Sequence, residues 1–389
     1  MSQDRRQFLA AAAAPLFVPQ SAFGANDRIN YALIAAGGRG RSVSRVFQKL
    51  GAQCVALCDV YEPNLAAAKK DAPDAKTYGN YHELLTEEKG ADAVLIASPD
   101  HHHYPMLMAA LAAKKDAYAE KPLSKTLEES AKMIKAVRGS KQVVQIGMQR
   151  RSAPAIHKAK KLVEEGVLGR VTLVKAQWHW NISQKLDNSP LPGPLDWAAF
   201  TGTAPKRAPE PMRFRRWRYF FDYAGGNMTD QGTHLMDVVQ WFMESGPPRS
   251  AVSQGYVAKM EGAEHPDVFS ATFEYPNFMA TWTLDYANSY QNGWSILFMG
   301  DKGTMILDDG GFKVFAEPWK REAEPIFAEG SPVPMETHVQ NFFDCIKSRQ
   351  DPNCTVEIAA NAVAGPHLAN LAMFQGKKMK LDSAGFKAS

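Results

Sequence analysis

Residues 29–40, Ile-Asn-Tyr-Ala-Leu-Ile-Ala-Ala-Gly-Gly-Arg-Gly, decide the fold of this chain. The segment begins as an apolar run that is typical of a buried strand, and it ends in glycines. A helical pattern follows from Ser42 to Leu50. A strand that passes through glycines into a helix predicts the opening of a β-α-β unit.

Strands and helices continue to alternate through the rest of the first third of the chain. This alternation predicts a parallel, doubly wound sheet, which is the Rossmann type of α/β domain, over residues 27–150. The later strand-like runs are Gln53 to Asp59, Ala93 to Ala97, Asp116 to Ala119 and Val143 to Gly147.

The pattern changes after residue 150. A long alternating strand at residues 171–180 is followed by a proline-rich stretch over 182–212 and a helix around 232–244. Five short strand-like runs then lie between residues 251 and 307, and two helices close the chain at 339–348 and 356–374. We therefore expect a second, α+β domain over 151–389, with an open, largely antiparallel sheet.

The N-terminus resembles a targeting segment. Arg5 and Arg6 precede a short apolar stretch, and Ala22 and Gly24 fit a cleavage site. Residues 1–25 are thus predicted to be a signal of the twin-arginine type, which implies the twin-arginine export machinery as a partner and a periplasmic or exported location. An amphipathic helix is the alternative interpretation. The apolar core is too short to span a bilayer, and no other candidate span is found.

Composition narrows the range of partners. The 389 residues carry 45 Lys and Arg against 41 Asp and Glu, and no basic block is interleaved with aromatic residues, which argues against nucleic acid. The four cysteines form no C-x-x-C pair, which argues against structural zinc. Three consecutive histidines, His101 to His103, should point in different directions, so no metal site is expected. The basic cluster between Arg213 and Arg218 is either a solvated loop or a substrate-facing segment.

The glycine turn predicts a dinucleotide site formed by Ala36, Gly37, Gly38, Arg39 and Gly40. Gly37 allows the backbone to approach a pyrophosphate, Gly40 permits close helix packing, and the helix N-terminus attracts the phosphates. Alanine stands where the usual fingerprint has its first glycine. Asp59, at the end of the second strand, should bind the ribose hydroxyls and favour NAD. Arg39 keeps NADP open, because its charge would offset the repulsion of a 2′-phosphate.

Three further motifs carry a resemblance to a known family. They are Ser98-Pro99-Asp100-His101-His102-His103, Glu120-Lys121-Pro122, and Asp230 to Asp237, which reads Asp-Gln-Gly-Thr-His-Leu-Met-Asp. Together with the glycine turn, they resemble the Gfo/Idh/MocA family of sugar oxidoreductases over nearly the whole mature chain. The resemblance implies a catalytic group of Lys121, Asp230 and His234. It also implies cofactor contacts from Ser98, Pro99, His103, Glu120, Lys121 and Gln149.

The chemistry of the three catalytic candidates agrees with alcohol oxidation. His234 is suited to accept the hydroxyl proton, Asp230 lies one helical turn before it, and Lys121 can stabilise a developing alkoxide. Taken singly, each has a structural alternative, since a lysine after a strand is usually exposed and Asp230 could cap its helix.

We expect an NAD(P)-dependent oxidoreductase that transfers a hydride between a hydroxyl of a sugar, glycoside or polyol and a tightly bound cofactor. A redox-neutral glycoside hydrolase is the alternative, although the relatives of that kind lack the lysine that is Lys121 here. A non-catalytic sugar sensor is a third. The resemblance also implies a homo-oligomer formed through an exposed sheet face. Candidate substrate contacts are Arg151, Trp180, Arg218 and Asp222.

Overall fold

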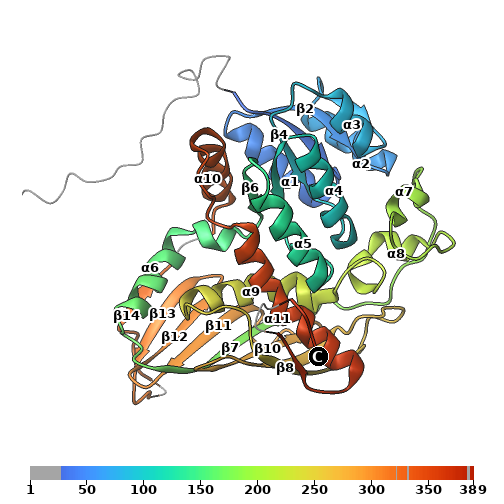
Figure 1. Cartoon of the computed structure of the whole chain (residues 1–389). Helices are drawn as coiled ribbons and strands as arrows, with labels where there is room; N and C mark the ends of the chain where they lie inside the picture. Colours follow the sequence, from blue (N-terminus) through green and yellow to red (C-terminus); the bar gives the residue numbers. More distant parts are fainter. Residues whose placement is uncertain (1–27, 321, 331–332, 383–385) are drawn as a thin grey trace, which may run out of the picture.

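The computed structural model describes residues 28–320, 322–330, 333–382 and 386–389. The predicted signal segment, residues 1–25, lies outside the described residues. Figure 1 shows a Rossmann domain, drawn in blue to green, above a broad second sheet whose helices face the first domain. Among the described residues, no helix is long and apolar enough to cross a membrane.

The first domain has the predicted parallel sheet, in the order β3-β2-β1-β4-β5-β6, and the short edge strand β3 is one that the sequence patterns missed. The chain moves outward from β1 and then returns to the other side of it at β4, which creates a crevice at the carboxyl ends of these strands. The strands are β1 (Asn30–Ile34), β2 (Gln53–Cys58), β3 (Lys76–Tyr78), β4 (Ala93–Ile96), β5 (Asp116–Ala119) and β6 (Val144–Ile146). The helices are α1 (Gly38–Lys49), α2 (Glu62–Asp71), α3 (Tyr81–Glu87), α4 (Asp100–Ala112) and α5 (Leu127–Arg138).

The second sheet is open and mostly antiparallel, in the order β14-β13-β12-β11-β7-β10-β9-β8-β15. Only the β7–β10 pair is parallel among these strands. The sequence patterns missed β13, β14 and β15. The strands are β7 (Val171–His179), β8 (Ser250–Tyr256), β9 (Val268–Glu274), β10 (Met279–Asp285), β11 (Gly293–Gly300), β12 (Gly303–Asp308), β13 (Gly311–Ala316), β14 (Phe327–Glu329) and β15 (Met379–Lys380).

Helices α6 (Pro154–Glu164) and α9 (Gly226–Phe242) cover one face of this sheet (Figure 1). Leu235 and Phe242 of α9 share a core with Trp282 and Phe298 of the sheet. Helix α9 begins six residues before the expected start at residue 232. The expectation relied on apolar spacing, and the first turns of α9 bury polar residues instead.

The last two helices return to the first domain. Val339 and Phe342 of α10 (Met335–Ser348) join the Rossmann core, and so does Val363 of α11 (Val356–Gln375) through a second cluster. Helices α10 and α11, which belong to the predicted second domain (residues 151–389), thus also pack against the first domain.

Candidate active site

The glycine turn adopts the expected geometry with an alanine in it. Ala35 has a φ of 67°, the left-handed conformation that glycine adopts most easily. A Cβ on Gly40 would lie 2.3 Å from the carbonyl oxygen of Ala35, so this position requires glycine. Helix α1 begins at Gly38, four residues earlier than predicted, and its free N–H groups therefore lie within the turn.

Asp59 and Arg39 contact different partners. Asp59 is buried and accepts hydrogen bonds from the N–H of Tyr61, at 2.9 Å, and from Asn64 Nδ2, at 3.2 Å. Burial raises the pKa of Asp59 to about 6. Arg39 Nη2 instead contacts Glu120 Oε1 at 2.8 Å, on the β5 side of the sheet. Arg39 therefore does not offset the charge of Asp59, and the site favours NAD as predicted.

A segment of the second half of the chain crosses the cofactor crevice. We call residues 193–217 the strap; it contains the short helices α7 (Trp197–Thr201) and α8 (Pro211–Arg215). Asp196 donates its N–H to the carbonyl of Val60 at 2.9 Å, and Leu195 forms a β-bridge with Tyr61. A cavity of 920 Å³ between strap and crevice is lined by Gly37, Asp59, Ser98, Pro99, Asp196, Ala199, Phe200 and Trp217.

The crevice has the features that a dinucleotide requires. Ser98 Oγ and Gln149 Oε1 are buried without a hydrogen-bond partner in the described part of the chain, which suits polar atoms that meet a ligand. The N-terminus of α1 suits the phosphates, and Asp59 suits the ribose hydroxyls. The cavity has room for the adenosine half.

His103 has a supporting position. It is buried, and its two ring nitrogens lie 2.6 Å from the carbonyl oxygen of Pro122 and 2.9 Å from that of Ser98. It thus links two loops of the crevice, rather than presenting a free nitrogen to the cofactor.

Lys121 and Asp230 meet across the domain boundary. Lys121 Nζ donates to Asp230 Oδ1 at 2.5 Å and to the Asp230 carbonyl at 3.0 Å, and Arg218 Nε donates to the same Oδ1 at 3.0 Å. Burial alone would raise the pKa of Asp230, but the charges of Arg218 and Lys121 hold it well below its usual range. Asp230 is the fifth residue of α9 and does not cap it. Three of the predicted residues thus form one cluster.

His234 lies one turn further along α9. Its Nδ1 is buried without a hydrogen-bond partner among the described residues. Burial, followed by the charges of Lys121 and Arg150, lowers the pKa of His234 well below its ordinary value, so the ring is neutral. Asp230 lies one helical turn before His234 but does not hydrogen-bond its imidazole. The carboxylate of Asp230 is turned toward Lys121 and Arg218 instead.

Asp100 is a candidate that the sequence analysis did not select. It is the first residue of α4, it is buried, and its Oδ1 has no partner in the described residues. Burial, with a contribution from the charge of Asp230, raises the pKa of Asp100 to about 7. Its place between Pro99 and the histidine run was the available signal.

Two of the proposed substrate contacts are engaged in packing. Arg151 Nε donates to the buried Asp237 at 2.7 Å, so it anchors α9. Trp180 follows β7, stacks on Tyr286 with ring centroids 5.6 Å apart, and is partly buried. Trp180 therefore packs among aromatic residues of the sheet.

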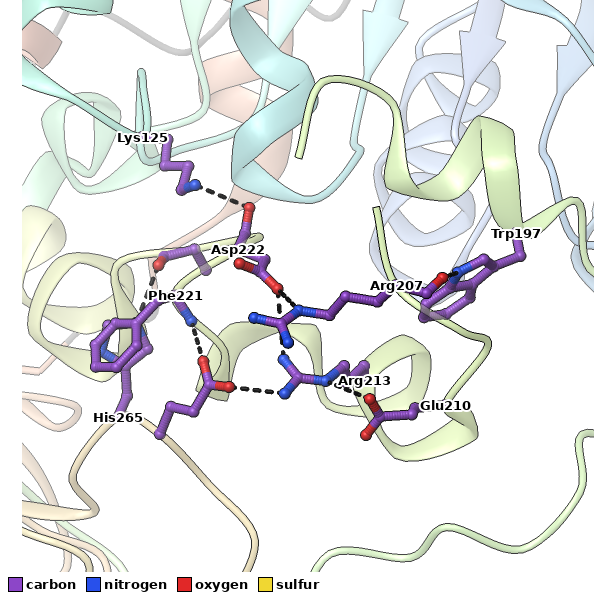
Figure 2. A network of polar contacts seen from close by, with 10 residues as sticks. Lys125, Trp197, Arg207, Glu210, Arg213, Phe221, Asp222 and His265 are labelled. Carbon is purple, nitrogen blue, oxygen red and sulfur yellow. Dashed lines mark hydrogen bonds and ion pairs between the residues drawn. The ribbon is translucent and has the colours of Figure 1, made fainter. Parts of the chain in front are cut away.

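Asp222 belongs to a network that holds the strap. Figure 2 shows Arg207 and Arg213 reaching its carboxylate and Lys125 reaching its backbone oxygen. Arg213 also pairs with Glu264 at 2.7 Å. The carboxylate of Asp222 is thus occupied by two arginines, away from the Lys121–Asp230 contact.

The three histidines are all hydrogen-bonded to backbone carbonyls. Contrary to the prediction, His101 and His102 converge, since the Nε2 atoms of both lie within 2.9 Å of the Phe200 carbonyl oxygen in the strap. No group of three or more His, Cys, Asp or Glu side chains that could hold a metal occurs in the described ranges.

Comparison with known families agrees with this site. A model of the Gfo/Idh/MocA oxidoreductase family, described as an NAD-binding Rossmann fold, matches residues 29–148. The model of the family's C-terminal domain matches residues 156–306. The chain belongs to the Gfo/Idh/MocA family. Its first domain is thus the NAD-binding domain of that family.

Individual relatives share part of the sequence or the whole fold. Inositol 2-dehydrogenase of Salmonella paratyphi B is 33% identical over 135 residues, which are 34% of this chain and 40% of the relative. The chain therefore matches less than half the length of this curated relative. The structure of aldose-aldose oxidoreductase from Caulobacter crescentus has a TM-score of 0.71 at 18% identity and covers 91% of this chain and 100% of its own. Levoglucosan dehydrogenase, in complex with NADH and levoglucosan, gives 0.71 at 17% identity, with 91% and 99% covered.

Proposed function

We propose that this protein oxidises a secondary hydroxyl of a sugar or polyol and transfers the hydride to NAD. One observation carries the proposal: Lys121 contacts Asp230 at 2.5 Å, and the neutral His234 lies one helical turn away beside the cofactor crevice. The family relatives named as inositol, levoglucosan and aldose oxidoreductases support this class of substrate.

The residues divide the chemistry between them. When bound, NAD⁺ supplies the acceptor for the hydride that leaves the carbinol carbon. A ring nitrogen of His234 accepts the hydroxyl proton, because the neutral imidazole has a free nitrogen. Lys121 donates a hydrogen bond to the oxygen as negative charge develops on it. Asp230 holds Lys121 in position and stays ionised, because it lies between the cations of Lys121 and Arg218. Since Asp230 does not take up the proton, His234 holds it when the ketone product forms.

The test begins with the nucleotide that copurifies with the protein. We would denature a sample to identify it, then screen sugars and polyols for reduction of bound NAD at 340 nm, an absorbance band typical of reduced nicotinamide. Lys121→Ala should lower the rate of reduction about 100- to 10,000-fold, because it removes the group that stabilises the alkoxide. Lys132→Ala, at an exposed site where the lysine pairs with Glu128, is the matched control and should leave the rate unchanged.

The products separate this proposal from glycoside hydrolysis. A keto product with reduced NAD supports the dehydrogenase, whereas release of an aglycone without net reduction would replace it with the redox-neutral hydrolase. Lys121 favours the dehydrogenase, because relatives of the hydrolase kind lack this lysine and because it contacts Asp230 in the catalytic cluster.

We also propose that the cofactor is tightly held, since the strap crosses its crevice.

The sequence of residues 1–25 further supports export by the twin-arginine route, which fractionation of cells expressing the chain with and without Arg5 and Arg6 would test. Exposed apolar residues on the open sheet, such as Val252, Tyr256 and Met279, support a homo-oligomer, which light scattering would test.

A further inference from the structure

Arg150 is a buried cation that forms no ion pair with an acidic residue in the described part of the chain. It lies in the turn η2 (Gln149–Ser152) and is 6% exposed. Its guanidinium lies over the ring of Trp294, at 3.8 Å from the centroid, and 5.4 Å from that of Trp178. Its Nη1 is buried without a hydrogen-bond partner, and it makes no ion pair within the described residues.

The nearest carboxylates are used elsewhere. Asp237 pairs with Arg151, and Asp309 accepts the indole N–H of Trp294. Burial lowers the pKa of Arg150 to about 10, and the charges of Asp309 and Asp237 offset this only in part. An isolated buried charge is costly unless a ligand or a counter-charge compensates it, so the site is incomplete in the free protein.

Arg150 belongs to the catalytic region. The next residue, Arg151, is bound to Asp237, which lies three residues after His234 on α9. The adjacent Gln149 has a buried Oε1 without a hydrogen-bond partner among the described residues, and the charge of Arg150 contributes to the lowered pKa of His234. The other cations nearby are already compensated: Arg39 contacts Glu120, and Lys121 and Arg218 share Asp230. Among these cations of the described chain, Arg150 is thus the one that no carboxylate contacts directly, although the charges of Asp309 and Asp237 act on it.

We propose that the substrate is a sugar acid whose carboxylate binds the edge of the Arg150 guanidinium. The inference rests on the proposed oxidoreductase function and names its substrate class. With Trp294 against one face, the guanidinium offers its edge, and a planar carboxylate matches that fork of donors in two parallel hydrogen bonds. A phosphate can pair with the same fork of donors, so a sugar phosphate serves as the competing probe in the test.

Matched substrates test this inference. The rate of NAD reduction is compared for glucose against glucuronate and for galactose against galacturonate, with glucose 6-phosphate as the phosphate probe. The acids should have at least about tenfold higher kcat/KM than their neutral partners. Arg150→Met should lower this acid preference about 10- to 100-fold, the range typical of a charge-assisted hydrogen bond. Arg150→Lys should restore part of it, and Arg170→Met, at an exposed position, should not change it.

A binding measurement keeps the inference separate from the proposed function. Glucuronate should quench the fluorescence of the tryptophans beside Arg150 in the wild type and not in Arg150→Met. If neutral sugars or the phosphate are preferred, or if Arg150→Met lowers acid and neutral rates equally, the carboxylate assignment is wrong. If no compound reduces NAD, the proposed function fails, and the fluorescence titration alone decides whether Arg150 binds acids.

Discussion

At the scale of single residues, the turn that begins the cofactor site contains an avoidable strain. Ala35 occupies the left-handed region with φ at 67°, which costs a residue with a Cβ about 1–2 kcal/mol relative to glycine. Its N–H still donates to the Cys58 carbonyl at 2.8 Å, so the strand edge keeps its register. The alanine therefore preserves the geometry of the turn at the expense of stability.

Ala35→Gly should consequently raise the free energy of unfolding by about 0.5–1 kcal/mol, after the greater entropy of glycine in the unfolded chain is subtracted. The midpoint of denaturant unfolding measures the change. Ala66→Gly, at an exposed position within α2, is the control and should lower stability by about 1 kcal/mol. If both substitutions lower stability, the alanine is not strained.

At the scale of elements, the strap covers the cavity of the cofactor crevice. Phe200 accepts hydrogen bonds from His101 and His102 of α4, and Leu195 pairs with Tyr61 after β2. Gly202 allows the strap to pack closely against α4, because a Cβ at this position would lie only 2.4 Å from His102 Cε1. The strap thus joins the second half of the chain to the carboxyl ends of the Rossmann strands.

We predict that Gly202→Ala increases the rate at which NAD dissociates by about tenfold, since the added methyl group must push the strap away from α4. Loss of nucleotide during gel filtration, followed by absorbance, measures this rate. Gly246→Ala, where a Cβ meets no atom within 4 Å, is the control and should retain NAD. Equal retention in both variants would show that the strap does not hold the cofactor.

At the scale of the whole molecule, buried histidines join the closing helices to the Rossmann domain. His338 of α10 hydrogen-bonds to the Ile146 carbonyl at 3.0 Å, and His367 of α11 to that of Ser124 at 3.1 Å. Burial lowers the pKa of both to about 4. The unfolded chain, with histidine pKa values near 6.5, therefore binds protons that the folded protein excludes between about pH 6.5 and 4.

The free energy of unfolding should thus fall as the pH falls through this window. Each histidine contributes about 1.4 kcal/mol per pH unit, because stability decreases wherever the unfolded state takes up more protons. The amide of His367→Gln can still donate to Ser124. In denaturant titrations from pH 7 to 4, this variant should therefore lose the part of the pH dependence of the free energy of unfolding that corresponds to one proton. His82→Gln, at an exposed position, should keep the wild-type slope. An unchanged slope in His367→Gln would contradict the prediction.

The sequence by itself determined the two sheets and most of their strands. It also predicted Lys121, Asp230 and His234 as a catalytic group, through motifs that resemble those of the family. Apolar periodicity, glycine spacing and short motifs are local signals, and the core elements follow them. The sequence patterns did not predict the polar first turns of α9 or the strands β3 and β13 to β15, most of which are too short to give a clear periodic signal.

Only the tertiary structure decided which charges meet. Asp230 turns to Lys121 and Arg218 instead of His234, and Arg39 contacts Glu120 instead of approaching Asp59. Arg150 lies against tryptophan rings and forms no ion pair among the described residues. These pairings join residues far apart in the chain, so no spacing predicts them. They follow from how the domains pack, because burial makes each unpaired charge costly and the geometry then determines which partner is within reach.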